Sequence, residues 1–532
     1  MTCRLRVGCA SVTPRGIEMA LRLTYTSGGI DSAAHVEFER CLAQARADTP
    51  APWPHLIDGV LRHEGDVFER SDPSRIDSVA SRAHAADAEV VGQAVEAARA
   101  ARAGWRRTPY RERIALLARV AREIAARNVE IAAVMSLETG KSRIEALSEA
   151  QEAVELIATY SREMERNDGF IALPLHGVSP EEHCSETLKP YGVFGVISPF
   201  NFPFALTLGM SVAALVCGNC VVVKPSEEAP WTAALLAEAM LAAELPAGVF
   251  NLVHGGPDSG RALAESAVDG IAFTGSAEVG RAITTRLTEG PYARPALTEM
   301  SGKNPTIVTA SADLARAAEG IGRAAFGLSG QKCSACSRAI VHETVHDELV
   351  AQICAFAVTL KLGDPADRES FLGPVINERA QFRFRQSVAQ AVRDGRVACG
   401  GDVGSERGWF VQPTVVADLP RGHELLRGEL FLPFIAVTRV ADLDEALAEA
   451  NSTEYGLTAA IFSEDRREID RFLDEIEAGV VYVNRRAGAT TGAWPGAQSF
   501  CGWKSSGSTG KGGMGPYYLQ QFMREQSHTV VS

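Results

Sequence analysis

The chain has 532 residues, and because a single hydrophobic core stops growing at about 250 to 300 residues, two or more domains are expected. Hydrophobic residues make up 46% and charged residues 22% of the sequence, which is ordinary for a soluble globular protein and excludes fibrous and disordered classes. With 53 basic against 66 acidic residues the net charge is -13, which argues against nucleic acid as a partner, because a phosphate backbone calls for a basic face.

The eleven cysteines follow no disulfide-like spacing, which favours a reducing compartment where a free thiol can serve as a nucleophile. Residues 1–20 contain arginines but no apolar run like that of an export signal, so a cytoplasmic location is expected. Residues 1–54 are interpreted as a polar leader, within which Met19 is a second candidate for the initiator.

Helical periodicity is expected to dominate from there to Met164, with apolar residues spaced i, i+3, i+4, i+7 from Val91 and again from Ile114. Gly140 is predicted to end the helix that holds Val134 and Leu137.

The stretch from Pro190 to Val223 has no Asp, Glu, Lys or Arg and is long enough to cross a bilayer. Glycines and prolines interrupt it, however, so it is interpreted as strand, loop, buried helix and strand.

From Tyr191 onwards strand-like and helix-like segments alternate, which predicts a parallel doubly wound sheet. The expected strands are 193–197, 220–223, 249–253 and 271–273, and the expected helices are 204–215, 231–243, 259–264 and 277–287. A second series runs from strand 305–308 through helix 315–325, strand 339–341 and helix 348–360 to strand 480–483. The sequence therefore predicts two α/β domains.

The tail from Arg485 is rich in Gly, Ser and Thr and then carries Tyr517, Tyr518, Leu519 and Phe522. A solvated tail has little use for these apolar side chains. They are interpreted as packing on a partner subunit.

Three motifs carry a thiol, a carboxylate and an amide: Cys333 in Gly-Gln-Lys-Cys-Ser-Ala-Cys-Ser-Arg, Glu299 in Leu-Thr-Glu-Met-Ser-Gly-Lys, and Asn201 in Ser-Pro-Phe-Asn-Phe-Pro. Oxidising an aldehyde needs a nucleophile, a donor for the oxyanion and a base that brings in water. Taken singly, the three residues read as a buried apolar cysteine, a surface carboxylate and a turn residue. Burial would raise the pKa of Glu299 towards neutrality, as a base requires.

Two further patterns bear on cofactors. Residues 273–280 (Phe-Thr-Gly-Ser-Ala-Glu-Val-Gly) follow a strand and open a helix, so that backbone N–H groups can face a pyrophosphate. Cys333 and Cys336 form one Cys-x-x-Cys pair and Cys217 and Cys220 another, but their separation is far greater than the roughly 15 to 20 residues of zinc sites. No metal is expected, and Cys336 is interpreted as a packing residue.

In combination and in order, these motifs resemble the aldehyde dehydrogenase superfamily from about Pro54 onwards. The resemblance implies that Cys333 is the nucleophile, that Glu299 is the general base, and that Asn201 stabilises the oxyanion together with the Cys333 backbone N–H. It also implies a Rossmann-type NAD-binding domain (55–165 and 190–296), a catalytic domain (297–484) and an oligomerisation arm (166–189 and 485–532), hence a homodimer or higher homo-oligomer.

The resemblance further implies that NAD is the cofactor. Lys224 and Glu227 would hold the adenosine ribose, where a carboxylate repels the 2'-phosphate of NADP, and Glu429 would hold the nicotinamide ribose. The implied cofactor-binding residues are Ser198, Pro199, Lys224, Ser226, Glu227, Gly256, Gly275, Ser276, Gly280, Glu429 and Phe431.

Within the superfamily, the Cys333 block, the Asn201 block and the stretch from Asn484-Arg485 to Thr491-Gly492-Ala493 most resemble the dehydrogenases of 1-pyrroline-5-carboxylate, or glutamate γ-semialdehyde. This implies oxidation to glutamate in proline catabolism, with the substrate carboxylate received by Ser334 and the backbone of the Gly492-Ala493 loop. The implied substrate-binding residues are Phe202, Ser334, Gly492, Ala493 and Phe500.

The sequence departs from the family at four positions: Ser301 and Leu432 stand for glycine, and Ser499 and Cys501 stand for proline and glycine beside Phe500. The alternatives are a dehydrogenase for another semialdehyde or an aliphatic aldehyde, a CoA-acylating enzyme, or, in a different class, a non-catalytic structural or binding relative.

Overall fold

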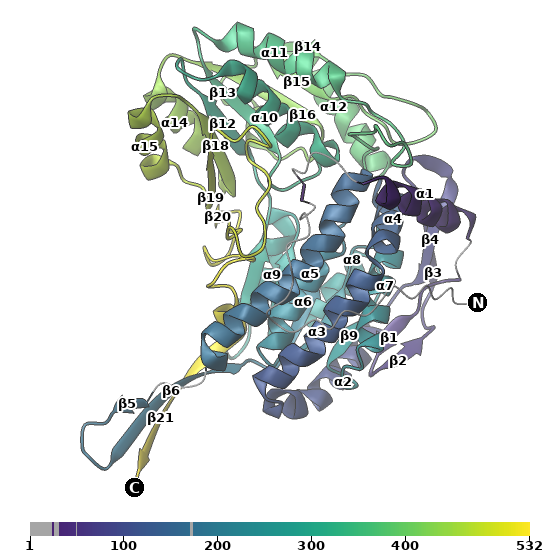
Figure 1. The fold of residues 1–532 in the computed structure, drawn as a ribbon, viewed down its shortest axis with the longest axis vertical. Coiled ribbons are helices and arrows are strands. Elements are labelled where there is room, and N and C mark those ends of the chain that lie inside the picture. Colours follow the sequence, from purple (N-terminus) through teal and green to yellow (C-terminus); the bar gives the residue numbers. More distant parts are fainter. Residues whose placement is uncertain (1–23, 26–30, 49–50, 171–173) are drawn as a thin grey trace.

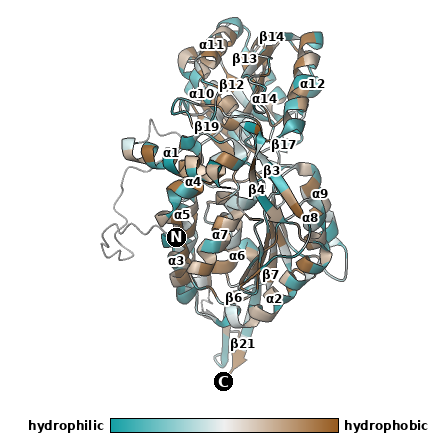
Figure 2. Cartoon of the chain, turned by 90° about the vertical axis from the view of Figure 1, so that its right-hand side faces the viewer, coloured by the Kyte–Doolittle hydropathy of each residue, from teal (hydrophilic) through white to brown (hydrophobic). Residues whose placement is uncertain are grey.

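The computed structural model describes residues 24–25, 31–48, 51–170 and 174–532. The chain forms two lobes, each built around a seven-stranded sheet, and an arm that projects from one lobe and carries the C-terminus (Figure 1). A view from the side shows the lobes stacked, with the arm at the far end of the lower lobe (Figure 2). This arrangement confirms the predicted α/β architecture.

The sheet of the lower lobe has the strand order β11-β10-β7-β8-β9-β1-β2. Strands β7 to β11 are parallel, while β1 and β2 are antiparallel additions at one edge. The side chains of β7, β8 and β10 are all buried, as expected of parallel strands covered by helices. The strands are β1 (His55–Ile57), β2 (Val60–Arg62), β7 (Val193–Ile197), β8 (Cys220–Lys224), β9 (Phe250–Leu252), β10 (Gly270–Thr274) and β11 (Ala296–Glu299).

Eight helices of this lobe follow the sequence expectation closely. They are α2 (Ala88–Arg107), α3 (Tyr110–Ala126), α4 (Asn128–Thr139), α5 (Arg143–Arg166), α6 (Ala205–Val216), α7 (Pro230–Ala242), α8 (Pro257–Glu265) and α9 (Ala277–Thr288). Gly140 ends α4 in a left-handed conformation with φ 71°, which confirms the predicted helix end. The uncharged stretch from Pro190 folds as β7, α6 and β8, and no helix in the described part of the chain is long and apolar enough to cross a bilayer.

Two sequence interpretations of the first hundred residues were wrong. Helix α1 (Ser32–Ala47) lies within the supposed leader and buries Phe38 and Leu42 against the lower lobe. Four strands also precede the helices, because β3 (Val67–Asp72) and β4 (Arg75–His84) form a hairpin after β1 and β2. Strands as short as β1 and β2 carry too few residues for a period to be recognised. Met19, the second candidate for the initiator, lies outside the described residues.

The sheet of the upper lobe has the order β14-β15-β16-β13-β12-β18-β19 and is parallel except for β14. Its strands are β12 (Asn304–Val308), β13 (Cys336–His342), β14 (Arg396–Cys399), β15 (Thr414–Ala417), β16 (Phe434–Val440), β18 (Thr458–Phe462) and β19 (Val480–Val483). Its helices are α10 (Leu314–Phe326), α11 (His346–Thr359), α12 (Glu378–Asp394), α13 (Glu424–Arg427), α14 (Leu443–Asn451) and α15 (Arg466–Glu475). Because β11 belongs to the lower sheet, that sheet extends past residue 296 to Glu299.

The arm is a three-stranded antiparallel sheet of β5 (Pro174–His176), β6 (Glu182–Pro190) and β21 (Met523–Val531), in the order β21-β6-β5. The remaining short elements are η1 (Asp168–Phe170), η2 (Gly327–Gly330), η3 (Leu519–Phe522), β17 (Tyr455–Gly456) and β20 (Trp503–Lys504).

The apolar residues of the tail pack on their own chain, so the expectation that they cover a partner was wrong for three of the four. Tyr518, Leu519 and Phe522 are buried in the core of the lower lobe. The Phe522 ring lies 4.9 Å from that of Phe194 in β7, because the chain returns along the lower sheet before entering the arm. Only Tyr517 is exposed.

Candidate active site

The predicted cofactor residues gather at one edge of the lower sheet. Strands β7, β8 and β9 lie side by side in sequence order, whereas β10 returns to the other side of β7. Ligands of such sheets bind in the crevice at the carboxyl ends of the strands, where the order reverses. The predicted residues follow these ends: Ser198 and Pro199 after β7, Lys224, Ser226 and Glu227 at β8, Gly256 after β9, and Gly275, Ser276 and Gly280 after β10.

Helix α9 begins just after the carboxyl end of β10, so its N-terminus lies at the same end of the sheet. The Ser276 hydroxyl accepts a hydrogen bond from the Val279 N–H at 3.3 Å, which caps the helix. Gly280 has no room for a side chain, because a Cβ there would lie 2.3 Å from the Met300 sulfur. The Ala277 N–H donates to the Ser301 hydroxyl at 3.3 Å, so what this first turn offers the pyrophosphate of a dinucleotide is chiefly the positive end of the helix dipole.

Lys224 and Glu227 form a pair at the end of β8. The lysine Nζ lies 3.7 Å from a Glu227 carboxylate oxygen and donates to the Gly255 carbonyl at 3.2 Å. Lys224 is buried, whereas the Glu227 side chain is 37% exposed. The carboxylate is therefore free to accept hydrogen bonds from the hydroxyls of a ribose.

Glu299 ends β11, at the boundary between the lobes. Its Oε1 accepts a hydrogen bond from the Gly513 N–H at 2.8 Å. Burial raises the pKa of Glu299 to about 7, and the Gly513 N–H opposes this shift. The carboxylate is thus poised to exchange a proton near neutral pH, as predicted for a general base.

Cys333 lies on the loop between η2 and the start of β13. The side-chain amide of Asn304 donates to the Cys333 carbonyl at 2.7 Å and to the Ala335 carbonyl at 2.9 Å, which fixes the loop. Burial raises the pKa of the Cys333 thiol to about 12, and the nearby carboxylates of Glu429 and Glu299 add to this. The thiol is therefore protonated in this state and must lose its proton to attack.

Asn201 lies in the buried loop between β7 and α6 and is 3% exposed. Tyr25 connects this loop to the loop that holds Cys333, which we call the nucleophile loop. The Tyr25 ring packs edge-on against the Phe202 ring at 5.6 Å, and its centre lies 5.8 Å from the Lys332 ammonium. The Tyr25 hydroxyl also donates to the buried carboxylate of Glu152, whose pKa burial raises to about 8.

Three buried glutamates of α5 lie behind the two loops. Glu145 holds the nucleophile loop, because its carboxylate pairs with Lys332 at 2.7 Å and accepts from the Leu328 N–H at 3.2 Å. Glu149 accepts from the N–H groups that follow Asn201 in the neighbouring loop. Glu152 receives Tyr25. Helix α5 thus supports both loops from one face.

The loop that holds Glu429 lies next to the nucleophile loop. Gly302, Lys332, Glu429 and Phe431 line one narrow hollow, and Glu429 Oε1 accepts from the Gly302 N–H at 3.0 Å. Burial raises the pKa of Glu429, and a hydrogen bond from the Ser301 hydroxyl opposes the shift. The serine that replaces the family's glycine therefore contacts the predicted ribose-binding carboxylate.

Two other departures have different surroundings. Leu432 is 3% exposed and packs in the core of the upper lobe with Phe434 and Val375. The Cys501 thiol donates a hydrogen bond to the Gly479 carbonyl at 3.4 Å. Cys336 is buried, with its sulfur 3.1 Å from the Thr306 hydroxyl, as expected of a packing residue.

The predicted substrate loop is fastened to the nucleophile loop. The Thr490 hydroxyl donates to the Ser334 carbonyl at 2.6 Å. The Arg485 guanidinium donates to the Thr491 carbonyl at 3.1 Å and to the Gly492 carbonyl at 3.3 Å. Gly492 has φ 101°, which a side chain would strain.

The other two predicted substrate residues lie on the loops already described. Phe202 directly follows Asn201 and packs against Tyr25. The Phe500 N–H donates to the carbonyl of Gly513, the residue that also binds Glu299. Ala493 is buried beside Gly492.

Sequence reasoning missed Tyr25, Lys141, the α5 glutamates and Thr490. Glutamates spaced along a helix rich in charged residues are typical of a solvent-exposed face, so nothing marked the glutamates of α5, or Lys141 just before it, as buried. The burial of Glu145, Glu149 and Glu152 becomes visible only once the loops pack against α5.

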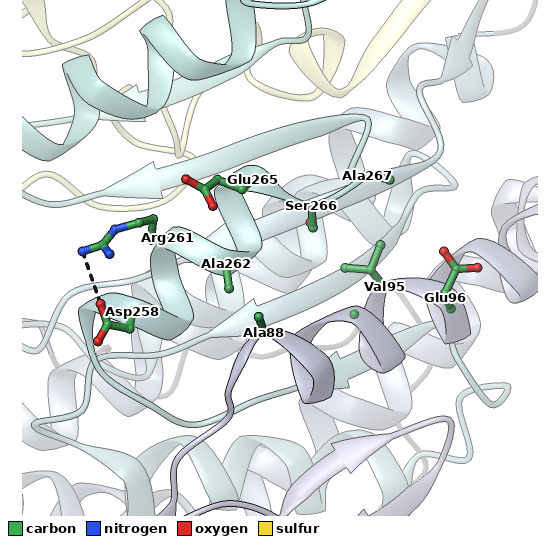
Figure 3. Close-up of a pocket in the computed structure, with 10 residues that line it drawn as sticks. Ala88, Val95, Glu96, Asp258, Arg261, Ala262, Glu265, Ser266 and Ala267 are labelled. Carbon is green, nitrogen blue, oxygen red and sulfur yellow. Dashed lines mark ion pairs between the residues drawn. The ribbon is translucent and has the colours of Figure 1, made fainter.

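A larger hollow of about 570 Å³ lies elsewhere, between α2 and α8 (Figure 3). It is lined by Ala88, Val95, Glu96 and Ala262, and by the ion pair Arg261–Asp258 at 3.2 Å. None of the predicted site residues lines it. Across the described residues, no group of three or more His, Cys, Asp or Glu side chains is placed to hold a metal ion.

The chain belongs to the aldehyde dehydrogenase family, whose model matches residues 61–528. It is 36% identical over 506 residues to a 1-pyrroline-5-carboxylate dehydrogenase of Geobacillus, covering 93% of this chain and 95% of the relative.

Two solved structures have the same fold. A 1-pyrroline-5-carboxylate dehydrogenase from Thermus with bound NAD has a TM-score of 0.91 and 30% identity, and the match covers 97% of this chain and all of that one. Proline utilization A from Bdellovibrio bacteriovorus also has a TM-score of 0.91, with 34% identity; the match covers 97% of this chain and 54% of that longer protein.

Proposed function

We propose that the chain oxidises L-glutamate γ-semialdehyde, the open form of 1-pyrroline-5-carboxylate, to glutamate in proline catabolism, with NAD as the cofactor. The class of reaction follows from the family, since the chain is an oxidoreductase acting on aldehydes. The substrate and cofactor are those named for its relatives in Geobacillus and Thermus. The observation that carries the proposal is the buried Glu299, with a pKa of about 7, beside the Cys333 thiol.

In this mechanism the Cys333 thiol releases its proton to water, and its sulfur bonds to the aldehyde carbon and forms a thiohemiacetal. The Asn201 amide and the Cys333 N–H donate hydrogen bonds to the oxyanion, where fixed donors stabilise developing charge. NAD bound in the crevice would supply the hydride acceptor, so that loss of hydride from this carbon would leave a thioester on Cys333. Glu299 then takes a proton from water, which attacks the thioester and releases the acid.

The residues at the crevice suit NAD. Glu227 offers a partly exposed carboxylate at the end of β8, and the start of α9 offers the positive end of a helix dipole. Lys224, Ser226 and Glu227 would hold the adenosine ribose, while Ser198, Pro199, Gly256, Gly275, Ser276 and Gly280 would line the crevice. Glu429 and Phe431 would hold the nicotinamide end from the opposite loop.

The tail of the substrate would lie against the loop fastened by Thr490 and Arg485. Ser334 and the backbone N–H groups of Gly492 and Ala493 would receive its carboxylate, and Phe202 and Phe500 would flank the carbon chain. An uncharged tail leaves such donors unpaired, at a cost of about 1 to 3 kcal/mol.

A panel of aldehydes with NAD, followed by NADH absorbance, tests the proposal. Glutamate γ-semialdehyde should exceed hexanal and propanal in kcat/KM by at least roughly tenfold. Ser334→Ala should shrink this advantage through the semialdehyde and leave the aliphatic aldehydes unchanged. If succinic semialdehyde or an aliphatic aldehyde is preferred, the substrate assignment fails and the dehydrogenase assignment stands.

We also propose that the enzyme works in the cytoplasm as a homodimer or higher homo-oligomer. Strand β21 supports the second part, because it is the nine-residue edge of the arm and presents exposed Val530 and Val531. An open edge of this length is a template for pairing with another chain. Light scattering of the intact chain, and of one ending before Arg524, tests the assembly: loss of the oligomer on truncation is expected.

A further inference from the structure

A lysine and a glutamate form a fully buried ion pair beside the Asn201 loop. Lys141 lies between α4 and α5, Glu149 lies in α5, and both side chains are 0% exposed. The Lys141 ammonium donates a hydrogen bond to Glu149 Oε2. Taking two charges out of water costs several kcal/mol per ion, so a buried pair is weak evidence for stability. The backbone groups that the two side chains bind say more about the role of the pair.

The pair grips both ends of the segment from Asn201 to Ala205. The Lys141 ammonium donates to the Asn201 carbonyl at 2.7 Å and lies 4.2 Å from the centre of the Phe202 ring. Glu149 Oε1 accepts from the Phe204 N–H at 2.9 Å and from the Ala205 N–H at 3.0 Å. These N–H groups open α6, where a carboxylate is favoured by the helix dipole.

We propose that the Lys141–Glu149 pair positions the oxyanion donor by fixing the backbone from which the Asn201 amide extends. An oxyanion donor is effective because it is held in place before charge develops. Lys141 binds the carbonyl of Asn201 itself, so losing the ammonium frees the donor's own peptide group. Both members are positioning residues, and the inference rests on the proposed role of Asn201.

The test is a double-mutant cycle between the pair and Asn201. Lys141→Met/Glu149→Gln removes both charges at similar volume and leaves an oxygen for the α6 N–H groups, so that no lone buried charge remains. Single-turnover NADH formation is measured at saturating NAD and aldehyde. Asn201→Ala should slow it by about 100- to 1000-fold. The pair variant should slow it by about 10- to 100-fold, because small misplacements of a donor are costly.

In the Asn201→Ala background the pair variant should change the rate by less than about twofold, because the group it positions is gone. Alkylation of Cys333 by iodoacetamide, which forms no oxyanion, should proceed at the native rate in every variant. This second readout separates positioning from damage to the nucleophile loop.

Glu138→Gln is the matched control. Glu138 is also a buried carboxylate that accepts two N–H groups at a helix start, from Trp231 at 2.8 Å and Thr232 at 2.7 Å in α7. Its substitution should leave the rate at saturating NAD close to native.

Each outcome decides a different claim. A native rate for Asn201→Ala would remove the oxyanion role itself, and with it this part of the proposed function. If Asn201→Ala is slow while the pair variant is native, or if the two effects multiply, the positioning claim fails and the mechanism stands. A parallel loss in alkylation, or an equal loss in Glu138→Gln, would also overturn it by revealing a general structural defect.

Discussion

At the scale of single residues, burial sets the protonation states that the chemistry needs. Burial raises the pKa of the Cys333 thiol, which keeps it protonated, and burial also raises the pKa of the Glu299 carboxyl to about 7. The sequence predicted both identities and the direction of the Glu299 shift. It could not predict the raised pKa of Cys333, because the burial of the thiol, and the approach of the Glu429 and Glu299 carboxylates that adds to the shift, both depend on packing between distant parts of the chain.

The pH dependence of kcat should report Glu299. A general base must be ionised, and burial holds the pKa of Glu299 at about 7, so kcat should fall about tenfold per pH unit below about 7 and level off above it. Steady-state rates from about pH 5 to about pH 9 measure this where thioester hydrolysis limits turnover. A profile that is flat through pH 7 would remove Glu299 from this role.

Glu227 should set the preference for NAD over NADP. Its carboxylate at the end of β8 would face the 2'-phosphate, and like charges in a partly solvated site interact by about 1 to 2 kcal/mol. Glu227→Gln should therefore narrow the ratio of kcat/KM values for the two cofactors by about 5- to 30-fold. Equal use of NAD and NADP by the unmodified enzyme would contradict this reading.

At the scale of elements, the alternation of apolar strands and helices from residue 191 was sufficient to predict two parallel sheets, because parallel strands are continuous apolar runs. Four strands of the upper sheet, β14, β15, β16 and β18, were not among the expected ones. Helix α1 was missed because it buries few residues, and β1 to β4 were missed because they are short or mostly exposed. The motifs supplied the groups that we propose carry the chemistry. The supports of those motifs stayed hidden, since Lys141 and Asn201 are joined only by the fold.

The loop after β19 offers a test of how an element holds the substrate. Thr490→Val keeps the shape of the side chain but removes its hydrogen bond to the Ser334 carbonyl. The substrate loop should loosen, and KM for glutamate γ-semialdehyde should rise by roughly fivefold, the value of one hydrogen bond. Hexanal is the control substrate, because its tail has no carboxylate. An equal rise in KM for both aldehydes would show that the loop does not recognise the carboxylate.

At the scale of the whole molecule, the C-terminal tail packs into the core of the lower lobe just before it enters the arm as β21. Phe522 is fully buried against Phe194, and Asn219 donates to its carbonyl at 2.9 Å. A pattern of aromatic residues in a polar tail predicts burial but does not say against which chain, which is why the partner assignment was wrong.

Phe522→Ala should lower the free energy of unfolding by about 3 to 5 kcal/mol, because it leaves a cavity in the lower core. Denaturant unfolding at several protein concentrations measures the loss, which should not depend on concentration if the contact is within one chain. Tyr517→Ala is the control, since that side chain is 61% exposed and its loss should cost less than about 0.5 kcal/mol. A loss that shrinks at high protein concentration would return Phe522 to a subunit interface.

The division of labour between Cys333 and Glu299 is tested most directly by measuring the mass of the Glu299→Gln variant after one turnover. The variant is mixed with NAD and glutamate γ-semialdehyde, quenched in acid, digested and analysed by mass spectrometry. We expect one equivalent of NADH per site and a glutamyl thioester on the peptide that holds Cys333, because the thiol attacks normally and hydrolysis lacks its base. Native steady-state turnover with no adduct on Cys333 would contradict it.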